Sequence, residues 1–161
     1  MGVRMNMMKR SLMTVAALLT LAGASALAQG RMIYSDTANA HADIAQALHT
    51  AALQHKHVIV DFGGNWCGDC IVLDIYFHQP QNLPILEQNY TLVHVNIGHY
   101  DQNLDIAEKY NIPLKHGVPL LMVLDARGRV LFIQNNREFE KMQYVTPASV
   151  TEFLNQWKPK R

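Results

Sequence analysis

Residues 58–70 read Val-Ile-Val-Asp-Phe-Gly-Gly-Asn-Trp-Cys-Gly-Asp-Cys, the most informative pattern in the chain. Its first residues form a short, β-branched, apolar run, which is typical of a strand that is buried on both faces. Gly63, Gly64 and Asn65 interrupt this run, and a helix is expected to begin near Cys67. The stretch therefore predicts a buried strand that turns directly into a helix carrying two cysteines in its first turn.

The rest of the chain alternates between helical and strand patterns. Helices are expected over 37–56 (with Asp36 or Thr37 as the N-cap), in a short piece ending near Asn89, over 101–110 and over 147–157, where Thr146 is the N-cap. Strands are expected over 91–97, 119–124 and 130–133, and Asp125-Ala126-Arg127-Gly128 is a hairpin signal between the last two. Strands joined through helices run parallel, and a hairpin adds an antiparallel strand. The sequence thus predicts an α/β domain with a central mixed β-sheet and helices on both faces.

The first 28 residues differ from the remainder. A basic start (Arg4, Lys9 and Arg10) precedes an apolar run over 12–21, and the segment closes with Ala26-Leu27-Ala28. This pattern predicts a signal peptide that is cleaved after Ala28, and hence a periplasmic or secreted protein. The alternative is an uncleaved N-terminal anchor helix. The expected organisation is a signal peptide over 1–28, a linker over 29–36 and a single domain over 37–161.

The composition is that of an ordinary globular domain, since 49% of the 161 residues are hydrophobic and 17% are charged. The segment 1–28 holds three of the 14 basic residues and none of the 13 acidic ones, so the remaining chain has 11 basic residues and a net charge of −2. No basic stripe is visible, and nucleic acid is therefore not expected as a partner. After cleavage of the leader, no stable membrane association is expected either.

Cys67 and Cys70 are the only cysteines, and three interpretations of the pair compete. As a structural disulfide, a loop this short contributes only about 2 kcal/mol in the chain-entropy model. As a zinc site, the pair supplies half of the ligands, and no second Cys-x-x-Cys or His cluster accompanies it. As a redox pair, it lies between a buried strand and a helix N-terminus. The sequence favours the redox interpretation, and no metal ion is expected.

The position of Cys67 supports exchange chemistry. Free backbone N–H groups and the helix dipole stabilise an anion at a helix N-terminus, so the thiol of Cys67 ionises more readily. The thiolate is the attacking species, so Cys67 is the expected nucleophile. Cys70 lies one turn further along and is the expected resolving cysteine. Trp66 would shield one side of the pair, although an aromatic residue at the edge of the core explains it as well.

The segment 60–70 resembles the active-site stretch of the thioredoxin family. The resemblance extends over about 40–157 and includes Val93-His94-Val95-Asn96-Ile97 as the next strand and Gly117-Val118-Pro119 before the hairpin. The Trp-Cys-x-x-Cys motif, an Asp six residues before Cys67 and a Val-Pro pair further on make it specific. It implies a thioredoxin fold and thiol–disulfide exchange with protein thiols and disulfides, and no cofactor beyond the redox-active disulfide.

The resemblance also implies roles for residues outside the motif. It makes Val118-Pro119 a cis peptide beside the cysteines, where the backbone of Val118 faces an incoming extended chain. An ordinary trans proline at the start of an edge strand is the alternative. It makes Asp61 the buried carboxylate that relays a proton to or from Cys70. A surface carboxylate at the end of the strand is the alternative there.

Three features depart from the family pattern. His94 stands where thioredoxins have a lysine close to the buried carboxylate, and a histidine would make the charge of that pair depend on pH; a core histidine without a catalytic role is the alternative. Gly63 replaces an aromatic residue, which is expected to leave that side of the site more open. The segment 135–144 replaces a compact turn with a longer charged one.

Asp69, between the cysteines, is the one local indication of redox direction. A negative charge beside the cysteines disfavours a thiolate, and a less stabilised thiolate makes a pair more reducing. The hypothesis is therefore a reductase that receives electrons from a membrane donor and acts on exported proteins. An oxidase or isomerase is one alternative. Another is an exported copper-binding or metallochaperone module, in which two thiolates and a histidine hold the metal.

Overall fold

The structure is a computed structural model and describes residues 32–135 and 145–160. The expected signal peptide and most of the segment 135–144 lie outside the described residues. In chain order the helices and strands are α2 (Ala40–Gln54), β1 (His57–Gly63), α3 (Gly68–Phe77), α4 (Leu83–Asn89), β2 (Tyr90–Asn96), α5 (Leu104–Lys109), the short 3₁₀ helix η2 (Leu114–His116), β3 (Leu120–Leu124), β4 (Val130–Ile133) and α6 (Pro147–Trp157).

The four strands form one mixed sheet in the order β2-β1-β3-β4. β1 is central: it runs parallel to β2, with Asp61 opposite His94, and antiparallel to β3, with Asp61 opposite Leu121. β4 pairs with β3 through the expected hairpin. The predicted α/β fold with a mixed sheet is confirmed, and the sheet places β1 where neighbours on both sides satisfy its backbone hydrogen bonds.

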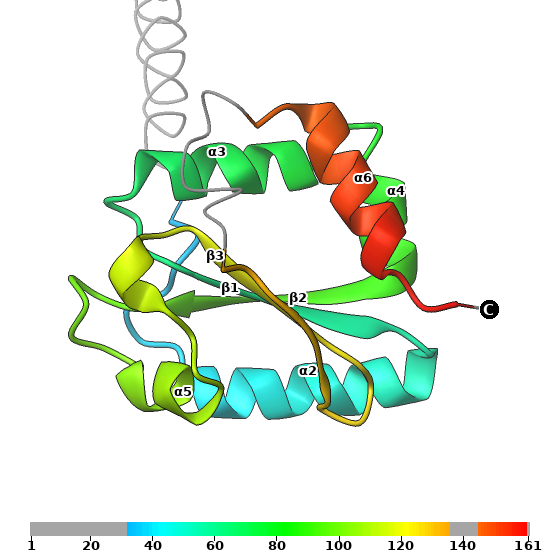
Figure 1. The fold of residues 1–161 in the computed structure, drawn as a ribbon. Coiled ribbons are helices and arrows are strands. Elements are labelled where there is room, and N and C mark those ends of the chain that lie inside the picture. The colour runs from blue at the N-terminus through cyan, green and yellow to red at the C-terminus, as the bar shows by residue number, and fades with distance from the viewer. Residues whose placement is uncertain (1–31, 136–144, 161) are drawn as a thin grey trace, which may run out of the picture. The chain divides into compact units, whose positions relative to one another are not determined.

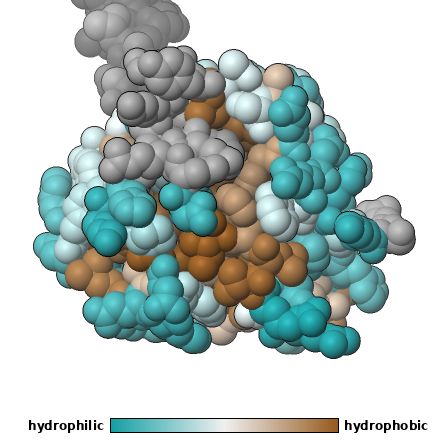
Figure 2. Space-filling view, viewed as in Figure 1, coloured by the Kyte–Doolittle hydropathy of each residue, from teal (hydrophilic) through white to brown (hydrophobic). Residues whose placement is uncertain are grey.

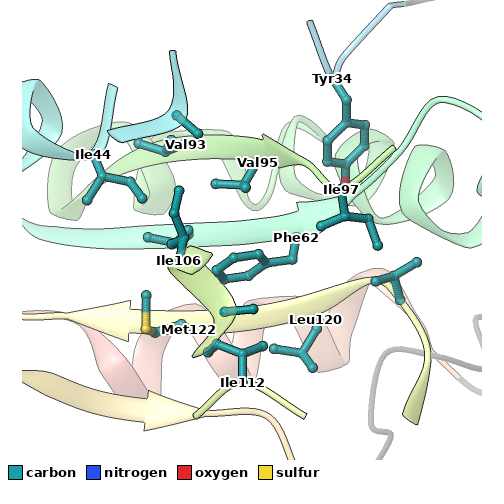
Figure 3. Close-up of a cluster of buried hydrophobic side chains, with 14 of the residues drawn as sticks. Tyr34, Ile44, Phe62, Val93, Val95, Ile97, Ile106, Ile112, Leu120 and Met122 are labelled. Atoms are coloured by element: carbon teal, nitrogen blue, oxygen red, sulfur yellow. The ribbon is translucent and has the colours of Figure 1, made fainter. Parts of the chain in front are cut away.

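Helices cover both faces of the sheet, with α2 and α5 on one face and α3, α4 and α6 on the other (Figure 1). Successive side chains of β1 point to opposite faces. Val60 and Phe62 pack in the core with side chains of α2 and α5. Figure 3 shows Phe62 in this cluster. Ile59 packs instead with side chains of α3, α4 and α6. Asp61 has the parity of Ile59, so its carboxylate lies on the α3 face.

Two helix starts differ from the sequence expectation. The N-cap of α2 is Asn39, whose side chain accepts a hydrogen bond from the N–H of Ala42, so Asp36 or Thr37 as the cap was wrong. The helix expected from residue 101 begins at Leu104, because Asn103 just before it has a positive φ of 52°. The expected cap of α6 is confirmed: Thr146 and Ser149 form a reciprocal capping box.

The edge strand β4 exposes part of its apolar side chains. Val130 is 43% exposed and Leu131 is 36% exposed, and hydrophobic side chains gather over this region of the face seen in Figure 2.

Among residues 32–135 and 145–160, no helix has both the length and the apolar character that a membrane crossing requires.

The segment before α2 is packed against the domain. Tyr34 is fully buried, although the sequence pattern predicts a linker at this position. The side chain of Asn65, in the turn after β1, holds this segment: its Oδ1 accepts from the N–H groups of Ile33 and Tyr34, and its Nδ2 donates to the carbonyl of Tyr34. The Asn65 side chain thus attaches this segment, which is not part of the sheet, to the domain through backbone hydrogen bonds.

We expect Asn65→Ala to lower the free energy of unfolding by about 2–3 kcal/mol, because three hydrogen bonds to partly buried backbone groups are lost together. Urea unfolding followed by circular dichroism measures the change. Asn89→Ala is the matched control: its Nδ2 donates to one backbone carbonyl within α4, so it should lose about 1 kcal/mol or less. Equal losses in the two variants would contradict the role given to Asn65.

Candidate active site

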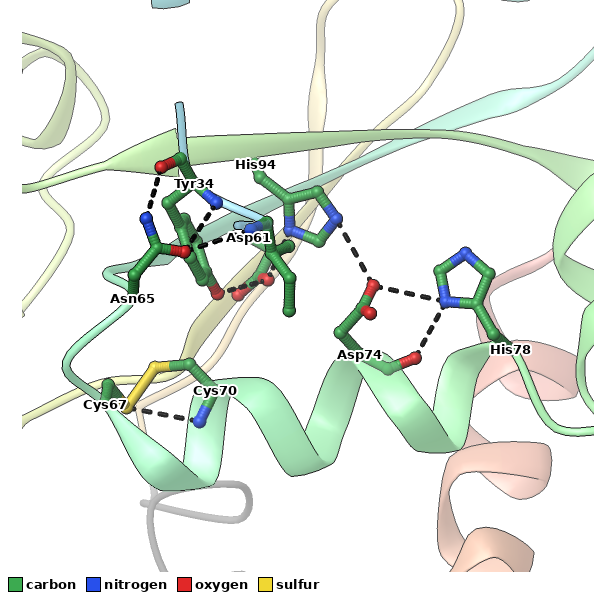
Figure 4. Close-up of polar contacts among 9 residues, drawn as sticks. Tyr34, Asp61, Asn65, Cys67, Cys70, Asp74, His78 and His94 are labelled. Atoms are coloured by element: carbon green, nitrogen blue, oxygen red, sulfur yellow. Dashed lines mark hydrogen bonds and ion pairs between the residues drawn. A yellow bond between two sulfur atoms is a disulfide. The ribbon is translucent and has the colours of Figure 1, made fainter. Parts of the chain in front are cut away.

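Cys67 and Cys70 form a disulfide at the start of α3. Cys67 is the N-cap residue, and its Sγ accepts a hydrogen bond from the backbone N–H of Cys70 at 3.1 Å (Figure 4). Cys67 retains 6% exposure while Cys70 is fully buried. A thiolate on Cys67 would therefore meet the free N–H groups of the helix, and it is the sulfur that an external disulfide reaches first.

The Val118-Pro119 peptide bond is cis and lies beside the disulfide. The carbonyl oxygen of Val118 is 3.6 Å from Sγ of Cys67. Residues 51 positions apart in the chain are thus brought together at the edge of the site. The backbone of Val118 borders the more exposed sulfur, which is the position expected for it from the sequence.

Asp61 is fully buried on β1 and has two polar partners. The hydroxyl of Tyr34 donates to its Oδ2 at 2.6 Å, and Nδ1 of His94, on β2, lies 2.9 Å from the same oxygen (Figure 4). Among the described residues, Oδ1 of Asp61 has no hydrogen-bond partner. The surface location considered for Asp61 is therefore excluded, and one carboxylate oxygen remains available to accept a proton.

The polar cluster extends away from the disulfide through Asp74, which is not among the site residues expected from the sequence. Nε2 of His94 lies 3.5 Å from Oδ1 of Asp74, and Nδ1 of His78 lies 3.1 Å from that oxygen. Asp74 is 1% exposed and shares the buried side of α3 with Cys70, Leu73 and Phe77. An acidic residue at helical spacing within this apolar stripe was the signal that could have identified it.

The histidines of the cluster connect the buried carboxylates to the surface. The side chain of His78 is 34% exposed and that of His94 is 18% exposed. His94 also lines a surface pocket of about 320 Å³ together with Ser35, Asp43 and Thr50. His94 is therefore in contact with Asp61 and Asp74 while it remains open to solvent.

Tyr34 occupies the space that Gly63 was expected to leave open. A Cβ atom on Gly63 would lie 2.5 Å from the hydroxyl oxygen of Tyr34 and 2.9 Å from Sγ of Cys70. The expectation of a more open site was therefore wrong, because the aromatic ring of Tyr34, in the segment just before α2, fills this side. Burial raises the pKa of the Tyr34 hydroxyl far above its usual range, and the nearby carboxylate of Asp61 raises it further.

Trp66 and Asp69 lie on the solvent side of the disulfide. Trp66 is 45% exposed, donates from Nε1 to the carbonyl of Gly98 at 2.6 Å and stacks on the ring of His99. The indole is thus fixed against the loop after β2, beside Cys67. Asp69 lies in the first turn of α3, partly exposed.

The copper alternative requires a third ligand beside the two sulfurs. Within residues 32–135 and 145–160, no group of three or more Cys, His, Asp or Glu side chains is arranged to hold a metal ion.

Comparison with known proteins agrees with this geometry. A family model described as thioredoxin-like matches residues 39–126, which is more than half of the chain and includes both cysteines, Asp61 and His94. A search of curated proteins returned no match.

Several solved structures are similar. A disulphide isomerase from Xylella fastidiosa Temecula1 is 25% identical with a TM-score of 0.74, over 78% of this chain and 96% of that one. The DsbD C-terminal domain of Neisseria meningitidis in its reduced form is 19% identical with a TM-score of 0.53, over 72% of this chain and 95% of that one. A thioredoxin from Thermus thermophilus is 18% identical with a TM-score of 0.53, over 70% and 81%. The last two show likeness of fold.

The matched segment carries the disulfide at a helix N-terminus, beside the Val118-Pro119 peptide and above a buried carboxylate. The chain therefore belongs to the thioredoxin-like family, as a thiol–disulfide oxidoreductase whose redox pair is Cys67 and Cys70.

Proposed function

We propose that this oxidoreductase works in the reducing direction on exported proteins, with electrons from a membrane donor. The observation that carries the proposal is the charge around the pair. Asp69 lies between the two cysteines, Asp61 is buried on β1 beneath α3, and Asp74 lies one turn beyond Cys70 on the buried side of that helix.

Negative charge close to a thiolate destabilises the reduced, ionised form of a cysteine pair. A pair whose reduced form is less stabilised is the stronger reductant. The helix N-terminus acts in the opposite sense, since it stabilises the Cys67 thiolate. The helix N-terminus is common to members of this fold, as is a buried carboxylate at the position of Asp61, so Asp69 and Asp74 set the direction in this proposal.

The residues of the site take the following roles in the proposal. Cys67 attacks the substrate disulfide, and Cys70 resolves the mixed disulfide. Asp61 exchanges a proton with Cys70, and His94 connects Asp61 to solvent. The backbone of Val118, before Pro119, aligns the substrate chain, and Trp66 covers one side of the pair. The reaction requires no cofactor or metal beyond the disulfide itself.

The proposed location rests on the leader pattern of residues 1–28. In an oxidising compartment a cysteine pair stays oxidised unless a dedicated donor reduces it. A reductase that acts there needs an electron source that reaches across the membrane, and a membrane donor meets this need. The C-terminal domain of DsbD from Neisseria meningitidis has a fold similar to that of this chain.

Disulfide isomerisation is the second candidate, and the likeness to a protein named as a disulphide isomerase favours it. An isomerase also uses a reduced Cys67, but it returns to the reduced state when the substrate itself resolves the mixed disulfide. Reactivation of scrambled ribonuclease, compared with insulin reduction at a fixed glutathione potential, separates the two. Insulin reduction without reactivation supports the reductase, and efficient reactivation supports the isomerase.

We expect Cys67→Ala to abolish insulin reduction, because the more exposed sulfur is lost. Cys70→Ala should retain the first attack but not resolve it, so a Cys67-linked mixed disulfide should accumulate in non-reducing mass spectra. Turbidity of reduced insulin measures the rate. Activity retained in Cys67→Ala, or a mixed disulfide formed by Cys70, would contradict the assigned roles.

We expect a reduction potential near or below about −270 mV, the value for thioredoxin, and far from the −120 mV or so of DsbA. Asp69→His should raise the potential by about 30 mV or more, because it removes a negative charge beside the thiolate. Equilibration with glutathione or dithiothreitol measures both values. Asp105→His, in the first turn of α5 on the opposite face, is the matched control and should leave the potential unchanged. No rise with Asp69→His would overturn the charge argument.

A further inference from the structure

We propose that the hydroxyl of Tyr34 carries the proton between Cys70 and Asp61. The proposal deepens the proposed function, since it assumes that Cys67 and Cys70 perform thiol–disulfide exchange. It assigns a reaction step to a residue of the N-terminal segment, which lies before the first helix of the domain and outside the Cys-x-x-Cys motif.

The geometry points to Tyr34 because its hydroxyl borders both groups. It donates to Oδ2 of Asp61 at 2.6 Å. It also lies near Cys70: a Cβ atom built on Gly63 would be 2.5 Å from the hydroxyl oxygen and 2.9 Å from Sγ of Cys70, so these two atoms are no more than about 5.4 Å apart. The absence of a side chain at Gly63 is what allows the hydroxyl and the sulfur to approach each other there.

Resolution of a mixed disulfide requires such a proton transfer. Once Cys67 is linked to the substrate, Cys70 is a buried thiol and must lose its proton to become a nucleophile. In the proposed step the proton of Cys70 passes to the Tyr34 oxygen, while the Tyr34 proton passes to Asp61. The Cys70 thiolate then attacks Sγ of Cys67, forms the Cys67–Cys70 disulfide and expels the substrate sulfur as a thiolate. The pair loses two electrons, the substrate disulfide gains them, and solvent protonates the leaving thiolate.

Tyr34 is suited to transfer a proton without becoming charged. Its burial and the adjacent carboxylates disfavour a tyrosinate, so it can only accept one proton while it gives up another. Asn65 fixes the backbone of Tyr34, and the ring packs edge-on against His94 at 5.2 Å. The titratable groups that face the hydroxyl are Asp61 on β1, His94 on β2, and Asp74 and Cys70 on α3.

A direct transfer from Cys70 to Oδ1 of Asp61 is the competing path, because that oxygen has no hydrogen-bond partner among the described residues. The two paths differ in one respect. Removal of the Tyr34 hydroxyl interrupts the proposed path and leaves the direct one intact.

The test is single-turnover oxidation of the reduced protein by glutathione disulfide, quenched with acid and analysed by mass spectrometry. Accumulation and decay of the Cys67–glutathione adduct give the rates of attack and of resolution separately. We expect Tyr34→Phe to slow resolution at pH 7 by about 10-fold to 100-fold, with attack unchanged. The defect should shrink toward alkaline pH, because hydroxide from solution can then remove the Cys70 proton without the relay.

Tyr90→Phe is the matched control. Tyr90 is also buried, and its hydroxyl donates to the carbonyl of Leu154 on α6. This variant should leave both rates unchanged. Asp61→Asn should slow resolution with the same pH dependence. The double variant that combines Tyr34→Phe with Asp61→Asn should be no slower than the slower single variant, because both substitutions interrupt one path. Circular dichroism verifies that each variant is folded.

Three results would overturn the proposal: unchanged resolution in Tyr34→Phe, a defect that is independent of pH, or additive effects of Tyr34→Phe and Asp61→Asn. The proposed function fails separately, if the wild-type protein forms no Cys67–glutathione adduct at any pH. If the wild-type protein and Tyr34→Phe resolve the Cys67–glutathione adduct at the same rate, only the role of Tyr34 is contradicted.

Discussion

The burial of the Asp61 carboxylate is the constraint on which the site depends. A carboxylate without exposure is costly unless polar groups compensate for lost hydration. Here the compensation comes from Tyr34 and His94, both bound to the same oxygen. The parallel register of β1 and β2 places His94 opposite Asp61, and the packing of the N-terminal segment supplies Tyr34. The register of β1 and β2 and the packing of the segment before α2 therefore both supply a polar partner to the buried Asp61 carboxylate.

The same strand delivers the cysteines. β1 ends at Gly63 and α3 begins at Gly68, so the redox pair comes directly after the strand that carries the carboxylate. The helical repeat then turns Cys70 and Asp74, four residues apart, to the same buried side. Cys67, at the N-cap, keeps the little exposure that the pair has. One short segment therefore separates an accessible attacking sulfur from a resolving sulfur that shares its surroundings with acidic groups.

The features that were predicted from the sequence are those that neighbouring residues encode. The apolar run before Gly63, the Cys-x-x-Cys spacing and the Thr146-Pro147 start of α6 each lie within one local segment, and each element was found where it was expected. The cap of α2 was misplaced because Asp36, Thr37 and Asn39 are all good caps, and only the backbone conformation decides among them. α5 began late for a similar reason, since the positive φ of Asn103 has no clear signal in the pattern.

The fold class, the redox pair and the buried strand before it could be predicted from the sequence, because hydrophobic periodicity and motif spacing are local properties of the chain. The groups that surround Asp61 could not be predicted in this way, because they come from distant parts of the chain. Tyr34 lies 27 residues before it and His94 33 residues after it, and Asp74 joins them from a third element. Their meeting depends on strand register and on helix packing, which arise from interactions across the whole domain. Tyr34 therefore read as part of a linker in the sequence, and the folded domain made it a partner of the buried carboxylate.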